Sequence, residues 1–290
     1  MSNNIKFSTE IWDYWFAGLI DGDGCFYINK QNEVSLEITT HVFDEKVLNN
    51  VKDTLKGGSV KLRSNSQSVR YRVKAKPIVY NVLQRVEGKI LNSVRFEQYN
   101  RACMVLNYNP FSAHTNDLRS NQTNSKYWGI AEKTAYLAGL IDSDGTFTIS
   151  VPKTSSEASI HPGVEGKIQR LLTSRGSNQL TLKIVGINKE HIENIAQFVN
   201  LGVVYDIKPK PRMKSDKHQY HWYIRTQDDF NRLIFNLKQY CPLRSVKMHR
   251  IRLVSVYFKY KSLGYHLSEP SSLQFKQWEK FCRSWYKYSY

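Results

Sequence analysis

The sequence has few cysteines, no long apolar run and a shortage of acidic residues. Its four cysteines (Cys25, Cys103, Cys241 and Cys282) show no CxxC pairing, which argues against a zinc site and indicates free thiols, mostly buried. No apolar segment is long enough to span a bilayer, and the N-terminus lacks the features of a secretory signal. We therefore expect a soluble protein that is not secreted and has no membrane partner.

Basic residues exceed acidic ones by a wide margin. The 290 residues include 42 Lys and Arg against 25 Asp and Glu, which gives a formal net charge of +17. An excess of this size on a soluble chain indicates a polyanionic partner, with nucleic acid favoured over a membrane. The length suits two domains of ordinary size, each able to bury its own core.

Two segments, residues 15–28 and 136–149, have nearly the same sequence. They read WFAGLIDGDGCFYI and YLAGLIDSDGTFTI, and nine of the 14 aligned positions are identical at an offset of 121. We interpret the similarity as an internal duplication. The pattern around the first copy predicts a helix that is capped by Ser8, begins near Thr9 and ends at Gly24 in a left-handed conformation.

Small residues recur four positions apart in both copies: Gly18 and Gly22 in the first, Gly139 and Ser143 in the second. This spacing allows two helix backbones to approach closely. If the two helices cross at these residues, their C-terminal ends lie side by side. That crossing would bring Asp23 and Asp144 to one place.

Two carboxylates at adjacent helix ends are electrostatically unfavourable, because each faces the negative end of a helix dipole and each repels the other. A hard divalent cation would compensate, with ligands from the carboxylates of Asp23 and Asp144 and from the backbone carbonyls of Gly22 and Ser143. Water held by such a cation can attack a phosphate. The alternative is a packing seam with solvated acidic ends, but packing alone requires no acid at the matched position in both copies.

These residues resemble a known family. FAGLIDGDG (residues 16–24) and LAGLIDSDG (residues 137–145) are similar to the signature of the LAGLIDADG homing endonucleases, and the double copy resembles the single-chain, pseudo-symmetric branch. The resemblance implies that the two helices form the interface between the halves. It also implies that Asp23 and Asp144 are catalytic and bind Mg²⁺, for which Mn²⁺ or Ca²⁺ can substitute in binding. Asp21 and Asp142 are then structural.

The rest of the sequence predicts the order α β β α β β α α in both halves, with Asp44 and Asn188 capping the helix after the second strand. The resemblance implies an α+β fold of two pseudo-symmetric αββαββα-type domains, each with a four-stranded antiparallel sheet that forms part of a saddle for DNA. A mobile insert is expected at 152–178. We expect four parts in the chain: a domain at 1–107, a linker at 108–130, a domain at 131–263 and a tail with an extra helix at 264–290.

Two predicted hairpins carry basic residues at many positions. Such strands are either exposed sheet edges kept soluble by charge or surfaces that bind phosphates, and the net charge favours the second. His218 and His221 lie three apart on a predicted strand and so point to opposite faces, which makes a shared metal ion unexpected. The predicted DNA-contacting residues are Asn29, Lys30, Gln31, Asn32, Lys61, Arg63, Arg70, Arg72, Lys74, Lys76, Lys183, Lys208, Lys210, Arg212, Lys214, Lys217 and Arg225.

A second matched pair of segments reads LNSVR at 91–95 and LRSVK at 243–247. Each segment places a cation, Arg95 or Lys247, at the start of an equivalent helix. In the family, a basic residue in this region is thought to stabilise transition-state charge, so the resemblance makes both residues catalytic candidates. The alternative is a pair of solvated surface cations. Because arginine is not deprotonated in proteins, Arg95 would act only through its charge.

These observations predict a monomeric, site-specific endonuclease for double-stranded DNA, with no obligate protein partner. The resemblance implies Mg²⁺-dependent hydrolysis of a long asymmetric target that leaves short 3′ overhangs, and encoding within an intron or intein, often of mitochondria or chloroplasts. The alternative is an intron maturase that acts on intron RNA, or a DNA-binding protein of the same fold that does not cut. Family members without activity often lack one of the acids, whereas this chain retains both.

Overall fold

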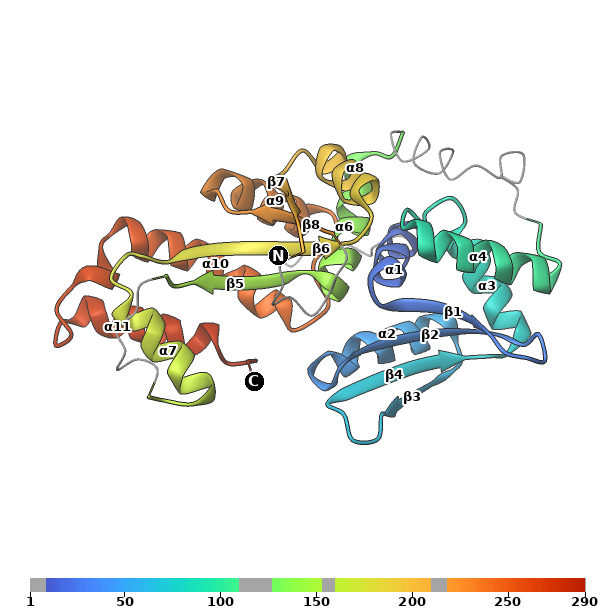
Figure 1. Cartoon of the computed structure of the whole chain (residues 1–290), viewed down its shortest axis with the longest axis horizontal. Coiled ribbons are helices and arrows are strands. Elements are labelled where there is room, and N and C mark those ends of the chain that lie inside the picture. The colour runs from blue at the N-terminus through green and yellow to red at the C-terminus, as the bar shows by residue number, and fades with distance from the viewer. Residues whose placement is uncertain (1–8, 110–126, 153–159, 210–217, 290) are drawn as a thin grey trace, which may run out of the picture.

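The computed structural model describes residues 9–109, 127–152, 160–209 and 218–289. They form an N-terminal half up to residue 109 and a C-terminal half from residue 127 (Figure 1). Among these residues, no helix combines the length and apolar character needed to cross a bilayer. The N-terminal half contains α1 (Thr9–Asp23), β1 (Gly24–Ile28), β2 (Val34–His41), α2 (Glu45–Leu55), β3 (Ser59–Leu62), β4 (Ser68–Val73), α3 (Lys76–Val86) and α4 (Ser93–Leu106). The C-terminal half contains α6 (Ile130–Asp144), β5 (Thr146–Ser150), α7 (Gly163–Thr173), β6 (Gln179–Gly186), α8 (Lys189–Val199), β7 (Val203–Ile207), β8 (Gln219–Ile224), α9 (Gln227–Gln239), α10 (Lys247–Ser262) and α11 (Leu273–Trp285).

Each half contains one four-stranded antiparallel sheet, with strand orders β1-β2-β4-β3 and β5-β6-β8-β7. The alternation along β4 shows how the sequence selects the faces, because Val69, Tyr71 and Val73 are buried while Arg70 and Arg72 lie on the opposite face. The apolar face packs against helices that include α2 and α3. The α+β fold with two four-stranded antiparallel sheets, predicted from the sequence and the resemblance, is confirmed.

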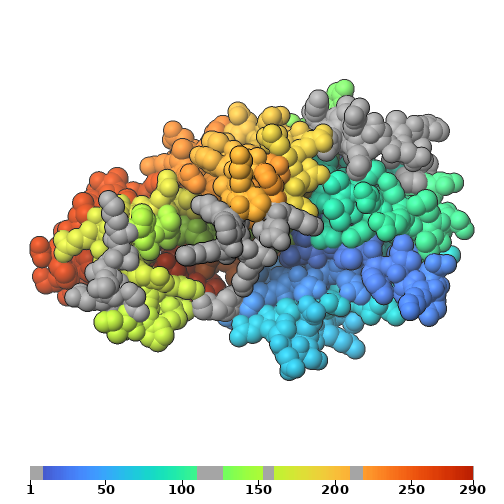
Figure 2. All heavy atoms as spheres, viewed as in Figure 1, coloured from blue at the N-terminus to red at the C-terminus, as the bar shows by residue number. Residues whose placement is uncertain are grey.

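The two halves meet where α1 packs against α6. A Cβ atom placed on Gly18 would lie 2.1 Å from the carbonyl oxygen of Tyr136, and one on Gly139 would lie 1.9 Å from that of Trp15. No side chain fits at these distances, so glycine allows the two backbones to touch. The predicted close approach at the small residues is confirmed. Figure 2 shows the atoms of the two halves in contact along their shared border.

The two duplicated helices end at the predicted acidic residues, but not in the predicted conformation. Gly145 has φ −66° and ψ 128°, and Gly24 is the first residue of β1 without a positive φ. The prediction of a left-handed glycine is therefore wrong. Glycine is required for space instead, because a Cβ on Gly24 would lie 2.6 Å from Cα of Ile20. Ser8, the predicted cap, lies outside the described residues.

The insert between the first two strands of the C-terminal half contains α7, which the sequence analysis did not predict. Its buried residues Ile168, Leu171 and Leu172 follow helical spacing, and α7 packs against α11. The prediction of a mobile insert is therefore wrong for this helix. The spacing is readable in the sequence, but the helix packs on a partner that lies 100 residues or more further along the chain. Short helices need such tertiary packing for their stability, so the local pattern alone did not identify it.

Candidate functional site

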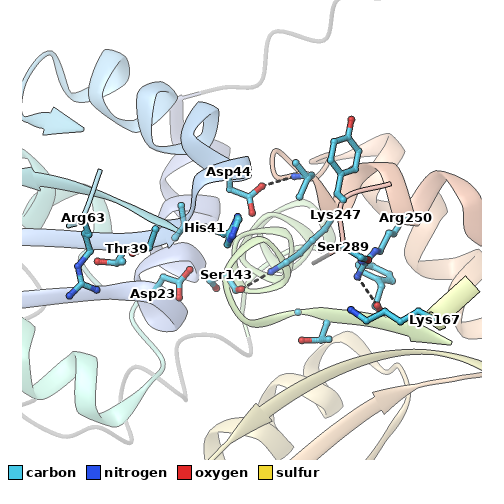
Figure 3. A pocket seen from close by; sticks show the side chains of 17 residues that line it. Asp23, Thr39, His41, Asp44, Arg63, Ser143, Lys167, Lys247, Arg250 and Ser289 are labelled. Atoms are coloured by element: carbon cyan, nitrogen blue, oxygen red, sulfur yellow. Dashed lines mark hydrogen bonds between the residues drawn. The ribbon is translucent and has the colours of Figure 1, made fainter. Parts of the chain in front are cut away.

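A cleft of about 610 Å³ opens where the C-terminal ends of α1 and α6 meet. Residues of both halves line it, including Asp23 and Asp44 from the N-terminal half and Ser143 and Lys247 from the C-terminal half (Figure 3). Its walls are formed by strand ends, helix starts and the last residues of the chain. The cleft is therefore a product of the duplication and of how the two copies pack.

The two predicted metal-binding acids lie together at this junction. Asp144 Oδ2 is only 3.2 Å from the position that a Cβ on Gly22 would occupy, so this carboxylate lies against the end of α1. Burial and the nearby charge of Asp144 raise the pKa of the half-buried Asp23 from 3.8 to about 7. The Asp144 residue is exposed, but the atoms around its carboxyl group still desolvate it. This desolvation raises the pKa of Asp144 as well.

The raised pKa of Asp23 means that the protein brings two carboxylates together without fully offsetting their charge. Neither pKa shift has a hydrogen bond among its causes, which are burial and nearby charges. Carboxylate oxygens suit Mg²⁺ and similar hard cations. The donor set therefore fits a divalent cation. Among the described residues no cluster of three or more His, Cys, Asp or Glu side chains has metal-site geometry, so water or backbone oxygens would complete the coordination.

Lys247 holds the end of α6. Its Nζ donates hydrogen bonds to the carbonyl oxygens of Ile141 (2.9 Å), Asp142 (2.9 Å) and Ser143 (2.6 Å). They lie in the last turn of α6, where carbonyl groups lack a full set of helical partners, although the Ile141 carbonyl also accepts from the backbone N–H of Gly145. The ammonium group adds a donor to each of them and offsets the negative end of the helix dipole. Burial lowers the pKa of Lys247, and the surrounding carboxylates, Asp142 first, oppose that shift. Lys247 is thus a half-buried cation at the edge of the cleft that donates three hydrogen bonds.

Arg95 occupies the equivalent position in the N-terminal half. Its Nη2 donates to the carbonyl oxygen of Gly22 at 3.3 Å. The positive charges of Arg95 and Lys247 lower the pKa values of Asp23 and Asp144 and so partly counteract burial. Both basic residues are therefore beside the acids, as the matched segments predicted. The carbonyl oxygens of Gly22 and Ser143, predicted as metal ligands, accept hydrogen bonds from these cations.

Asp21 is the structural member of the first acidic pair. It is buried and accepts hydrogen bonds from the backbone N–H of Leu91 (2.7 Å) and Asn92 (3.0 Å), and from the hydroxyl of Tyr136 in the other half (2.5 Å). The first two contacts fix the segment that leads into α4. Asp21 therefore determines where Arg95 lies.

Asp142 does the same for the C-terminal half. It accepts from the backbone N–H of Arg244 (2.9 Å) and Ser245 (3.0 Å), and from Nε1 of Trp15 in the other half (2.9 Å). The first two contacts hold the segment that leads into α10 and so position Lys247. Both acids also link the two halves, because each has one partner across the interface.

Asp44 has a different role from the predicted one. Its side chain makes no cap hydrogen bond to α2; instead Oδ1 accepts from the backbone N–H of Val246 at 2.6 Å, in the other half and next to Lys247. Asn188 does cap α8 as predicted, and its Nδ2 also donates to Ser93 Oγ at 2.8 Å. The two matched residues thus reach across to the helix that carries the opposite cation. Both residues stand at the N-cap of the helix that follows the second strand of their repeat. This shared position could have indicated a shared role in contacts between the halves.

The predicted DNA-contacting residues are distributed over several surfaces. Arg63 lines the cleft, whereas Arg70 and Arg72 on the open face of the first sheet each form a 2.9 Å ion pair with Glu37. Arg225 stacks on Tyr223, 4.1 Å from the ring centroid. Exposed positions are held by Lys30, Gln31, Asn32, Lys61, Lys74, Lys76 and Lys208, and intermediate ones by Asn29 and Lys183.

Lys76 begins α3 instead of ending the hairpin, and its Nζ lies 5.7 Å from the ring centre of Tyr80. His218 pairs with Asp206 at 3.4 Å while His221 contacts Tyr223 and Gln219. The described part of the second hairpin excludes four of its predicted contacts: Lys210, Arg212, Lys214 and Lys217.

Comparison with known proteins gives consistent matches. The sequence model of the LAGLIDADG endonuclease family matches residues 16–106 and 137–258. The chain is 26% identical over 95% of its length to the "Probable intron-encoded endonuclease aI2" of Debaryomyces hansenii, and 29% identical over 98% to the "Intron-encoded RNA maturase bI4" of Saccharomyces cerevisiae. It spans only 38% and 37% of the length of these two relatives.

Solved structures show the same fold. The LAGLIDADG meganuclease I-AabMI, bound to uncleaved DNA, superimposes with a TM-score of 0.58 and 15% identity over 92% of this chain and 98% of the other. The homing endonuclease I-LtrWI, bound to target DNA, gives a TM-score of 0.59 and 15% identity over 95% and 98%. At this identity the similarity concerns the fold alone.

Proposed function

The chain belongs to the LAGLIDADG endonuclease family, and we propose that it is a metal-dependent, site-specific endonuclease that cuts both strands of a long, asymmetric duplex DNA. The observation that carries the proposal is the meeting of Asp23 and Asp144, from equivalent helices of the two halves, at the junction where the cleft opens. Asp23 lines the cleft, as do Ser143 and Gly145 on either side of Asp144. Two acids with raised pKa values beside two cations suit phosphodiester hydrolysis better than they suit a packing seam.

In the proposed reaction, Asp23 and Asp144 hold Mg²⁺, for which Mn²⁺ or Ca²⁺ can substitute in binding. A divalent cation at this position supplies an activated water and stabilises the leaving oxygen. The two carboxylates must be ionised to bind it, so their raised pKa values make cation binding pH-dependent. Gly22 and Ser143 offer further oxygens only where Arg95 and Lys247 leave a lone pair accessible.

Arg95 and Lys247 act through their charge. The three N–H groups of Lys247 donate to helix carbonyls, and Arg95 remains protonated at all accessible pH values. Neither is therefore assigned a proton-transfer role. Their fixed positive charge beside the acids stabilises the negative charge that develops on the phosphate.

We assign the target-binding role to the open faces of the two sheets, in domains at 1–107 and 131–263. The polar, basic faces would follow the duplex while the cleft lies over the scissile phosphates. Since the two halves differ in sequence, the half-sites differ and the target is asymmetric. One chain holds both halves of the site, so the proposed active species is a monomer, and short 3′ overhangs are the expected product.

A second candidate function is an RNA maturase. The specific observation in its favour is the 29% identity over 98% of the chain to an intron-encoded RNA maturase. This function would require intron RNA as partner and would not depend on the carboxylates of Asp23 and Asp144. The two activities are therefore separable by substitution at these residues.

The test is cleavage of candidate DNA by the purified protein. The substrate is the uninterrupted allele of the host gene, or a randomised duplex library from which cut sites are recovered, incubated with Mg²⁺. We expect double-strand cleavage by the wild-type protein and by the exposed-surface control Asp53→Asn. Asp23→Asn and Asp144→Asn should abolish double-strand cleavage and retain binding. A variant at either position that still cuts both strands would refute the assignment.

A further inference from the structure

Within the described residues, the C-terminal half carries two additions that have no equivalent in the N-terminal half. The first two strands of the N-terminal half are joined by the short turn at 29–33, whereas β5 and β6 are joined through α7. After α10 the chain continues into α11, where Trp278 and Trp285 are fully buried. Glu165 of α7 forms a 3.2 Å ion pair with Arg283 of α11. The insert and the tail thus pack together as one unit on one side of the molecule.

This unit reaches the cleft beside the acids. Ser289 Oγ accepts a 2.7 Å hydrogen bond from Arg250 Nη2, while Arg250 Nη1 donates to the carbonyl oxygen of Phe147 at 2.9 Å. Lys167 of α7, Arg250 of α10 and Ser289 of the tail all line the cleft. We call these three residues the α7/tail subsite. The ring of Tyr288 packs on His249, with centroids 5.2 Å apart, and thereby fixes the end of the tail.

The subsite is not a product of the duplication. The offset of 152 that relates Lys247 to Arg95 relates Arg250 to Gln98. Gln98 Oε1 accepts from the backbone N–H of Phe26, the equivalent of Phe147. Both residues therefore support the first strand of their sheet, but the one in the N-terminal half is neutral. Lys167 has no counterpart, because the turn at 29–33 contains no helix.

Cations stand at both ends of the cleft with acids between them. Figure 3 shows Arg63 at one end, Lys167 and Arg250 at the other, and Asp23 and Asp44 in the space between. Arg63 follows β3, so the two ends are built from non-equivalent elements. Ammonium, guanidinium and hydroxyl groups are the side-chain donors that proteins use for backbone phosphates. Nucleic-acid backbone that crosses the acidic centre would present phosphates to both ends.

We propose that the α7/tail subsite binds a backbone phosphate of duplex DNA on the C-terminal side of the cleft, giving this half an anchor that the other half lacks. The proposal rests on the DNA binding inferred above, but not on cleavage. The subsite recognises phosphate and no base, so its contribution is independent of DNA sequence. The protein therefore binds the two half-sites with unequal strength. The difference comes from the insert and the tail, not from the duplicated fold.

The test measures the affinity for a mixed-sequence duplex as a function of KCl concentration, with Ca²⁺ in place of Mg²⁺. Lys167→Gln is compared with Lys280→Gln, which makes the same change at an exposed residue of α11 that does not line the cleft. One lost phosphate contact lowers the slope of log K against log [salt] by roughly 0.9. We expect this decrease for Lys167→Gln and an unchanged slope for Lys280→Gln.

Ser289→Glu provides a second, independent test, because it places a carboxylate beside Arg250 that competes with phosphate. Ser289→Gln is its neutral control. We expect Ser289→Glu to lower duplex affinity at least threefold relative to Ser289→Gln. Equal slopes for both lysine variants, or equal affinities for both serine variants, would overturn the proposal, as would effects seen only with a structured RNA. Because no cleavage is measured, loss of the nuclease assignment and loss of the subsite are distinguishable.

Discussion

Replacing Asp23 by Asn should make the metal-free protein more stable at alkaline pH while removing its cleavage activity. In the folded protein, burial and the Asp144 charge raise the pKa of Asp23 from 3.8 to about 7. The folded state therefore binds a proton on this group more tightly than the unfolded state does. The contribution of Asp23 to stability is therefore most favourable below about pH 4, decreases as the pH rises towards 7, and is fully lost above pH 7. Asn carries no charge, so the Asp23→Asn protein does not lose this stability as the pH rises.

The size of the effect follows from the shift. A change from 3.8 to about 7 corresponds to at most about 4 kcal/mol, since one pKa unit is about 1.4 kcal/mol. Because Asp23 is half-buried and lines an open cleft, solvent screening reduces this value, and we expect about 2 kcal/mol at pH 8. For a chain of this size that amounts to a rise in Tm of roughly 4–8 °C.

The assay is thermal unfolding of wild type, Asp23→Asn and the exposed control Asp53→Asn at pH 8 and pH 5, with EDTA. The advantage of Asp23→Asn should be present at pH 8 and shrink at pH 5, where wild-type Asp23 is already protonated. Mg²⁺ at pH 8 should raise the Tm of the wild type, because it binds only the folded state, and raise that of the variant less. An Asp23→Asn protein that is no more stable at pH 8, or equally favoured at both pH values, would refute the reasoning.

Three further substitutions test the scaffold around the acids. Lys247→Met removes the ammonium donor from three helix-end carbonyls, of which that of Ile141 keeps a backbone donor, Gly145 N–H. Urea unfolding should show a loss of about 3 kcal/mol, and Lys247→Arg should recover part of it. Gly139→Ala places a methyl 1.9 Å from a carbonyl oxygen of α1 and should cost about 3 kcal/mol or more, against less than about 1 kcal/mol for Gly88→Asn, where no atom lies within 4 Å. Asp44→Ala should slow cleavage more than Asp44→Asn, because only Asn retains an acceptor for the Val246 N–H that adjoins Lys247; equal rates would contradict this positioning role.

The sequence by itself determined the duplication, the extent of most helices and strands, and the meeting of Asp23 with Asp144. These features are encoded locally. Self-similarity identifies two equivalent helices, glycine at fixed spacing permits their backbones to touch, and alternation along a strand separates the buried face from the open one. Each of the two helices ends at an acidic residue. Once the helices pack against each other, the position at which the two acids meet is therefore largely fixed.

The tertiary structure alone decided which partners complete the site. Asp44 bonds to Val246, 202 positions away, and Asn188 to Ser93, 95 positions away. Both contacts cross between the halves, and the local capping pattern at Asp44 and Asn188 does not identify these distant partners. The ammonium of Lys247 caps a helix that ended more than 100 residues earlier. The α7/tail subsite likewise depends on an insert and a tail that meet only when the chain is folded. Such contacts are set by how preformed elements pack, so they follow from shape and burial in three dimensions and leave no periodic trace in the sequence.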